Sequence, residues 1–281
     1  MIHDPRPIVP MNPEGLDELA SKLLEGVIVP KAAAPSDLPN PESCILLEGR
    51  QHGAYSYPDL LVRTHRLGYT DTVGKVAQTL GLTVKNTAQE QDGSQYIGSI
   101  QQKQAIDLVK GLNYVPLTMR LHVDFLKEIN SGREGKRVFD GNGNNVSRKD
   151  LEQIWNEITE VRNPWRAEWL DNRFSKKGKQ WYVTYHQIQQ DGTLNEVTEA
   201  LEECLMIDKT PGIDLRDWLN RATTQGLPPS NVIDGTMYYR RPQDGAVAWF
   251  GADSDRAFLN GSRDLQDSYS ALGVRVAKIK A

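Results

Sequence analysis

The chain has 281 residues, 38% of them hydrophobic and 25% charged, which is enough for a sizeable core without disulfides. Its net charge of -4 and its lack of a basic run argue against nucleic-acid binding. No apolar stretch is long enough to span a membrane, and the first ten residues lack the pattern of a secretory signal. We therefore expect a cytoplasmic protein that does not insert into membranes. The two cysteines, Cys44 and Cys204, exclude a disulfide-framework fold.

The first third of the chain is rich in proline, which limits it to short elements. A leucine stripe predicts one helix over residues 13–26, and the apolar run at 44–47 predicts a strand. Two further helices are predicted over 57–67 and 71–80, each followed by a glycine. We interpret residues 1–95 as a partly helical N-terminal extension.

From residue 96 onward the pattern is typical of one continuous domain. A helix is predicted over 101–112, and Thr118 can cap a second helix. Ser147 and Asp150 form a capping-box pattern for a third helix, which Asn163-Pro164 ends.

Residues 165–174 are predicted as another helix, and the alternating run 179–188 as a strand that turns at 190–192. A short helix over 214–222 follows, with Trp218 inward. The remaining strands are predicted at 237–241, 245–250 and 271–279, with a polar, turn-rich loop between the last two. The order of elements predicts an α+β fold with short strands and two main helices.

Motifs of catalysis and metal binding are missing from the sequence. The tract 140–151 is similar to a calcium loop, with Asp140, Asn142 and Asn144 at ligand positions, but Asn145 and Leu151 replace the required glycine and glutamate. We interpret it as a tight turn. The histidines do not pair at metal-ligand spacing; they are His3, His52, His65, His122 and His186. We expect no catalytic centre, no metal and no cofactor.

The segment before the last strand mixes large aromatic residues with short polar ones. Aromatic rings provide contact area at low entropic cost, and small polar residues provide adaptable hydrogen bonds, as in antibody binding loops. We predict that nine residues share one solvent-facing surface and form a ligand site. They are Trp249, Gly251, Asp253, Phe258, Asn260, Ser262, Asp264, Asp267 and Tyr269.

Residues 246–279 (AVAWFGADSDRAFLNGSRDLQDSYSALGVRVAKI) resemble the variable region of proteins diversified by retroelements, a family of phages, bacteria and archaea. Chains of this family end on a core strand similar to L-G-[FV]-R, and Leu272-Gly273-Val274-Arg275 stands there. Family variation comes from adenine-directed mutagenesis, largely at asparagine codons. Such codons can yield eight of the nine predicted site residues, whereas Trp249 needs a different template codon.

The resemblance implies a C-type lectin fold, in the subtype shared with formylglycine-generating enzymes, over residues 96–281. It also implies a variable ligand-binding segment at about 246–271 and a non-catalytic, receptor-type function. The expected partner is a variable ligand, most simply a protein, and the oligomeric state stays open.

Two other functions are possible for a chain with this fold: an oxidoreductase and a carbohydrate-binding lectin. An oxidoreductase related to formylglycine-generating enzymes needs a cysteine pair near the C-terminal core, but Cys44 and Cys204 lie outside the final segment. A calcium-dependent carbohydrate-binding lectin resembles E-P-N or Q-P-D followed by W-N-D, which residues 241–244 and 248–250 do not match. Both are disfavoured, the enzyme more strongly.

Overall fold

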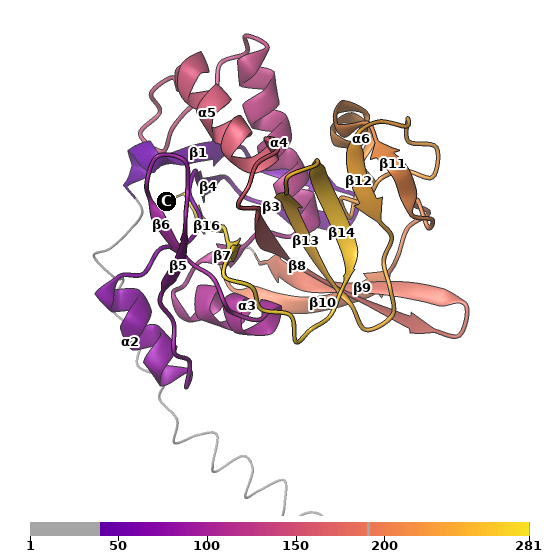
Figure 1. Cartoon of the computed structure of the whole chain (residues 1–281), viewed down its shortest axis with the longest axis horizontal. Coiled ribbons are helices and arrows are strands. Elements are labelled where there is room, and N and C mark those ends of the chain that lie inside the picture. Colours follow the sequence, from indigo (N-terminus) through magenta and orange to yellow (C-terminus); the bar gives the residue numbers. More distant parts are fainter. Residues whose placement is uncertain (1–39, 190–191, 281) are drawn as a thin grey trace, which may run out of the picture. The chain divides into compact units, whose positions relative to one another are not determined.

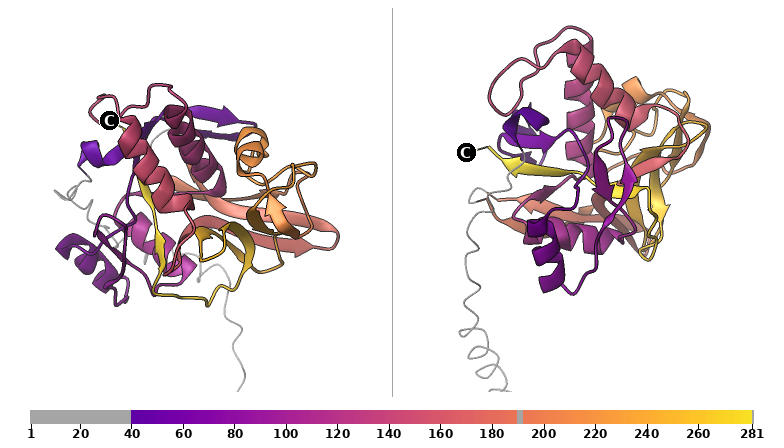
Figure 2. Two further views of the ribbon diagram at one scale, coloured as in Figure 1. Left: turned by 45° about the horizontal axis from the view of Figure 1, so that its top comes forward. Right: turned by 60° about the vertical axis from the view of Figure 1, so that its left-hand side comes forward.

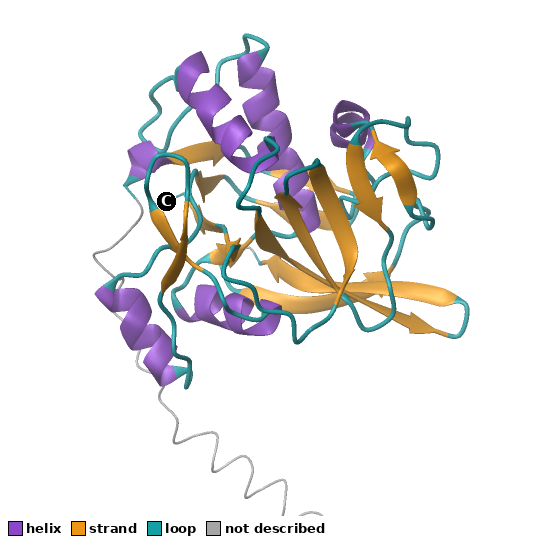
Figure 3. Ribbon diagram, viewed as in Figure 1, coloured by secondary structure: helices purple, strands orange, loops and turns teal. Residues whose placement is uncertain are grey.

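A computed structural model describes residues 40–189 and 192–280, so the helix predicted over 13–26 and part of the turn at 190–192 lie outside the described residues. The described chain is a mixed α+β structure, as expected (Figures 1 and 3). A short 3-10 turn, η1 (Pro41–Ser43), precedes the first strand. The α-helices are α2 (Asp71–Thr79), α3 (Gln102–Gly111), α4 (Met119–Arg133), α5 (Arg148–Thr159) and α6 (Leu215–Arg221).

The larger sheet holds the predicted ligand-binding segment. Its strands run in the order β10-β9-β8-β13-β14-β12-β11, and β15 pairs in parallel with β8. Its strands are β8 (Arg166–Lys177), β9 (Gln180–Ile188), β10 (Leu194–Ala200), β11 (Lys209–Ile213), β12 (Met237–Arg240), β13 (Val247–Ala252), β14 (Ala257–Arg263) and β15 (Leu272–Val274).

A smaller sheet joins the two ends of the described chain. Its order is β1-β4-β16-β7, so the last strand lies between two others, beside β4 (Figure 2, right). Its members are β1 (Cys44–Leu47), β4 (Leu60–Arg63), β7 (Val115–Pro116) and β16 (Val276–Ile279). Two hairpins complete the strands: β2 (Arg50–His52) with β3 (Tyr55–Tyr57), and β5 (Asn86–Gln89) with β6 (Gln95–Ile97).

This pairing corrects the predicted division into residues 1–95 and 96–281. The strands β1 and β4 share a sheet with the C-terminal strand β16, so residues 44–63 belong to the same compact unit as the rest of the described chain. The sequence pattern missed this because pairing partners over 200 residues apart leave no local signal.

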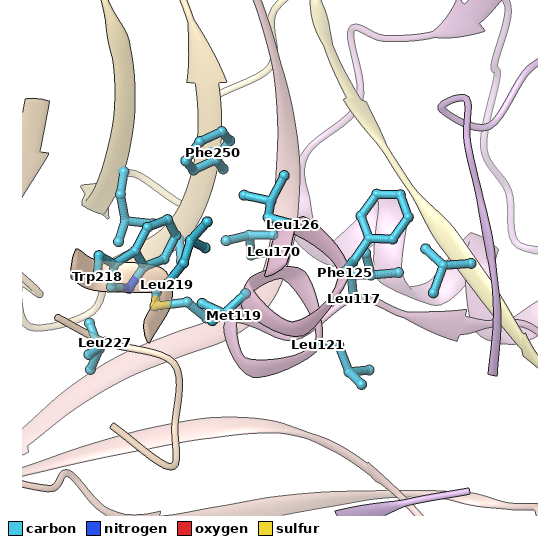
Figure 4. Packing of buried hydrophobic residues seen from close by; sticks show 14 of the residues in the cluster. Leu117, Met119, Leu121, Phe125, Leu126, Leu170, Trp218, Leu219, Leu227 and Phe250 are labelled. Atoms are coloured by element: carbon cyan, nitrogen blue, oxygen red, sulfur yellow. The ribbon is translucent and has the colours of Figure 1, made fainter. Parts of the chain in front are cut away.

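Two hydrophobic clusters lie on opposite faces of the larger sheet. Along β13, Val247 and Trp249 face the cluster of α2 and α3, whereas Ala248 and Phe250 face the cluster of α4, α5 and α6. Figure 4 shows part of the second cluster, in which the rings of Phe250 and Trp218 stack 5.9 Å apart. Because β13 is buried on both faces, it holds the candidate site rigidly.

The predicted helix starts are confirmed. Thr118 accepts a hydrogen bond from the backbone nitrogen of Leu121 at the start of α4. Ser147 accepts one from the backbone nitrogen of Asp150 at the start of α5. The helices expected over 71–80, 101–112 and 214–222 are also present, as α2, α3 and α6.

Three predicted elements were wrong. Residues 57–67 contain strand β4 instead of a helix, residues 165–174 lie in strand β8 instead of a helix, and the expected loop after Phe250 contains β14. β8 and β14 are interior to their sheet and pack apolar side chains on both faces, so the alternation of polar and apolar residues that marks a half-exposed strand is weak. In β4 the burial does alternate, but four residues are too short a run to distinguish a strand from a helix.

The calcium-like tract forms the tight turn that we expected. Asp140 accepts hydrogen bonds from the backbone nitrogens of Asn142 and Asn144, and Gly143 has a φ of 82°. In the described ranges, no three His, Cys, Asp or Glu side chains come together as a metal site. Within residues 40–189 and 192–280, no helix has both the length and the apolar character needed to cross a bilayer.

Candidate ligand-binding surface

Several predicted site residues lie on one face of β13 and β14. In the antiparallel register Trp249 pairs with Asn260, and Gly251 pairs with Phe258. Ser262 follows on β14, and its hydroxyl donates to Asn260 Oδ1 over 3.0 Å. The sheet therefore brings these five residues together.

The expected exposure was wrong for three of them. The exposed fraction is 3% for Trp249 and 7% for Phe258, and Gly251 is buried as well. A side chain at position 251 would place its Cβ 2.5 Å from the Cβ of Ala167 on the neighbouring strand. Because β13 lies between β8 and β14, these three positions are structural, and position 251 accepts only glycine without a shift of the backbone.

The buried Trp249 ring is the centre of an aromatic cluster, which consists of Trp165, Trp249, Phe258, Arg263 and Tyr269. From the Trp249 ring centroid, the rings of Phe258, Trp165 and Tyr269 lie at 5.2, 5.4 and 6.3 Å. The guanidinium of Arg263 lies 4.1 Å from the same centroid, within cation–π range. Tyr269 is 40% exposed, and Trp165 and Arg263 are half-buried. The cluster thus has a buried floor and an open rim.

The segment after β14 returns over the cluster. The Trp165 and Tyr269 rings meet edge-on, 5.6 Å apart. Asp267 pairs with Arg263 at 3.5 Å and accepts from the Tyr269 hydroxyl at 3.4 Å, both long contacts. These weak ties leave the rim with hydrogen-bonding capacity for a ligand.

Two predicted site residues mainly hold turns. The carboxylate of Asp253 accepts from the backbone nitrogens of Asp255 and Arg256, in the turn between β13 and β14. Asp264 accepts from the backbone nitrogen of Gln266. Asp264 is exposed next to the rim, whereas Asp253 lies in a turn apart from the aromatic contacts.

Two nitrogen donors in the cluster have no acceptor among the described residues. They are Nε1 of Trp249 and Nε of Arg263, and both atoms are buried. A buried donor without an acceptor costs roughly 1–3 kcal/mol. An acceptor group that entered between these side chains would recover part of this free energy.

Three further residues contribute to this surface. The sequence predicts a helix at Trp165 and a loop at Arg263, and the third residue, Tyr238, pairs with Phe258 across β12 and β14. The signal for the first was the period-two spacing of Trp165, Ala167 and Trp169, all of which face the same cluster. Arg240 and Arg256 lie 5.0 and 5.8 Å from the Tyr238 ring and extend the surface across β12.

The L-G-V-R segment is fixed in the core. A Cβ on Gly273 would lie 2.7 Å from the ring of Tyr96. Arg275 Nε donates to Glu168 Oε2 over 2.9 Å, with both side chains buried. Burial opposes ionisation of Glu168, but Arg275 and then Arg66 hold its pKa below the ordinary value.

Both cysteines are free and buried. Burial raises the pKa of Cys44 to about 11 and that of Cys204 to about 12. The thiols are therefore protonated at neutral pH, which disfavours the nucleophilic thiolate that cysteine chemistry needs.

Comparison of the chain with protein-family models, with curated proteins and with solved structures finds no match.

Proposed function

We propose that this chain is a non-catalytic ligand-binding protein and that the rim of the aromatic cluster is its binding surface. The observation that carries the proposal is the arrangement of Trp165, Arg263 and Tyr269 around the buried Trp249 ring, beside the polar residues of β14. Trp, Tyr and Arg are the residues that most often dominate the energy of protein interfaces. A protein ligand fits this composition best.

We further propose that the domain has a C-type-lectin-like fold of the formylglycine-generating-enzyme subtype. Two features support it. The helices α3 and α4 precede many short strands, and the last strand, β16, lies inside a sheet. The L-G-V-R segment also has the buried contacts expected of a core strand.

Membership of the retroelement-diversified variable proteins is part of the same proposal, with a smaller variable set. Trp249, Gly251 and Phe258 serve as scaffold because they are buried. Asp253 holds the β13–β14 turn through its backbone contacts. The other five predicted positions are exposed or half-buried and remain open to diversification on a fixed backbone, since side chains outside the core contribute little to folding. They are Asn260, Ser262, Asp264, Asp267 and Tyr269.

A displayed random-peptide library tests the binding surface. Peptides selected on the whole chain should lose binding to a Tyr269→Ala/Arg263→Ala double variant by at least tenfold. They should keep binding to Tyr69→Ala, a matched control, because Tyr69 is a similarly exposed tyrosine elsewhere on the chain. Selected peptides that bind all three proteins equally would contradict the proposed surface.

The flanking DNA tests the family. We expect a near-copy of the coding segment for residues 246–271 that differs almost only at adenines, beside a reverse transcriptase gene. A locus without such a copy would contradict diversification while leaving the binding surface open to the peptide test.

A further inference from the structure

A separate pocket of about 440 Å³ lies between η1, the β5–β6 hairpin and α5. This volume is in the range of small-molecule sites, about 300–1,000 Å³. Among the described residues, its lining includes no lysine or arginine side chain, and His65 is the one basic residue. The carboxylates that line it are Glu42, Glu90, Asp92, Asp150 and Glu157. The side chains that line the pocket are therefore mainly acidic, although arginines behind the wall pair with Glu90 and Glu157.

Two of these carboxylates are fixed by a buried arginine. Arg66 Nη1 lies 3.3 Å from Glu90 Oε1 and 3.2 Å from Glu157 Oε1, and its side chain is fully buried. Glu157 Oε2 accepts from the backbone nitrogen of Gln91 and pairs with Arg162. The floor is thus preorganised, which lowers the entropic cost of binding.

Glu90 differs from Glu157 in one respect. Its Oε1 takes both bonds from Arg66, one from the backbone nitrogen and one from the guanidinium. Its Oε2 has no partner among the described residues, although the side chain is only 1% exposed. An unpaired carboxylate oxygen at such a burial is costly, and a donor brought by a ligand would remove that cost.

The rest of the wall combines held polar groups with aliphatic ones. His65 is held through both ring nitrogens, by Thr64 at 3.0 Å and Asp92 at 2.8 Å. Ile45 and Ile154 contribute apolar side chains to the lining. Such a wall suits a ligand with both a charged head and an alkyl part.

We propose that this pocket binds a small organic cation, an alkyl amine or an alkyl guanidine. The head group donates to Glu90 Oε2, and the alkyl part lies against Ile45 and Ile154. The same chemistry could be supplied by a free amine or by a basic side chain of a peptide. A metal ion fits less well, because the described carboxylates do not gather into a group that could hold one.

Isothermal titration calorimetry on the whole chain tests this site. The probes are agmatine and 1,5-diaminopentane as free cations, N-acetylarginine amide as the peptide-like cation, and 1,5-pentanediol as the neutral analogue. We expect at least one cation to bind at least tenfold more tightly than the diol, more weakly at high salt. Tighter binding of N-acetylarginine amide than of agmatine would identify a peptide source, and the reverse a free amine.

The variants locate the binding. Glu90→Gln should weaken binding of the best cation at least tenfold. Since Glu90 also holds Arg66, the exposed rim variants Asp92→Asn and Asp150→Asn test the same pocket with less risk to folding, and each should weaken binding severalfold. The matched control Asp255→Asn, an exposed aspartate in the β13–β14 turn, should change nothing. Equal affinity for diol and cations, no response to the rim variants, or binding of Ca²⁺ without any amine would each overturn the proposal.

Discussion

Arg275 connects the last strand to the rest of the core. Its guanidinium donates to Glu168 Oε2 on β8 and to the backbone carbonyls of Arg63 and Thr64, at the end of β4. One side chain therefore links both sheets. Because Arg275 is completely buried, truncating it would leave all three of these acceptors without their donor.

We predict that Arg275→Met lowers the free energy of unfolding by about 3–5 kcal/mol, because it leaves the buried carboxylate of Glu168 without its cation. Urea unfolding measures this change. The double variant Arg275→Met/Glu168→Gln should recover part of the loss. Arg216→Met, at an exposed arginine, is the control and should unfold like the unaltered protein. A loss of the same size in the control would mean that the contacts of Arg275 are not the cause.

His122 gives a prediction on pH. Burial lowers its pKa from 6.5 to about 4, although Glu168 works in the opposite direction. The unfolded chain binds this proton more readily, so the stabilisation is complete above about pH 7 and is lost as pH falls from 6.5 toward 4. At 1.36 kcal/mol per unit, the loss is on the order of 3 kcal/mol.

Urea unfolding at a series of pH values checks this. His122→Gln should flatten the slope of unfolding free energy between pH 6.5 and 4, while the half-exposed His65, changed to Gln, is the matched control and should keep it. An unchanged slope in His122→Gln would show that another group causes the acid sensitivity.

Two residues of the aromatic cluster, Trp249 and Tyr269, should respond differently to substitution. Trp249→Ser should cost about 3–5 kcal/mol, as for large-to-small changes in a core. Tyr269→Ser should stay within about 0.5 kcal/mol because the ring is exposed. Thermal unfolding of the two single variants compares them. If both variants melted at the temperature of the unaltered chain, the aromatic cluster would not contribute to the stability of the fold.

At the scale of elements, the helices that begin at a capping residue were the most predictable part of the fold. Thr118 and Ser147 signal helix starts through local hydrogen bonds, which a short stretch of sequence contains. The pattern of strand β8 resembles a helix because the charged residues Glu168 and Asp171 interrupt its buried apolar side chains. Their polar partners come from distant segments, so the sequence alone could not show that these buried carboxylates have hydrogen-bond partners in the core.

The same limit applied to the candidate site. The segment and its mixture of aromatic and small polar residues followed from the sequence, whereas the pairing of these residues across β13 and β14 did not, because most of them were expected in a loop. The burial of Trp249 did not, since it depends on Trp165, which lies 84 positions earlier and packs against it.

The cap of α5 provides a prediction at this scale. Ser147→Ala removes the acceptor for the backbone nitrogen of Asp150, which should lower the unfolding free energy by about 1 kcal/mol. Chemical denaturation measures it. Ser254→Ala, at an exposed serine in a turn, serves as the control and should have no effect beyond about 0.5 kcal/mol. Equal losses in the two variants would argue against a capping role.

At the scale of the whole molecule, the smaller sheet connects the C-terminal strand with strands from the first part of the described chain. β16 pairs with β4 on one side, where Ala277 lies opposite Val62, 215 positions earlier. On the other side it pairs with β7, where Val276 lies opposite Pro116, 160 positions earlier. Contacts so distant along the chain form only when the intervening loops have closed, at an entropic cost. The last strand contributes to both cores, since Val276 belongs to the cluster of α2 and α3 and Ala277 to the cluster of α4, α5 and α6.

This arrangement predicts the effect of truncation. A chain that ends at Val274 lacks both β16 and Arg275, so β4 and β7 lose their common partner and Glu168 loses its cation. We expect it to lose cooperative unfolding, with exposed apolar surface that binds a hydrophobic dye. A chain that ends at Ile279 keeps the whole of β16 and should unfold with a midpoint close to that of the full chain. Circular dichroism during urea titration distinguishes the two. Cooperative unfolding of the shorter chain, at an unchanged midpoint, would show that the larger sheet folds without the C-terminal strand and would reduce β16 to a peripheral element.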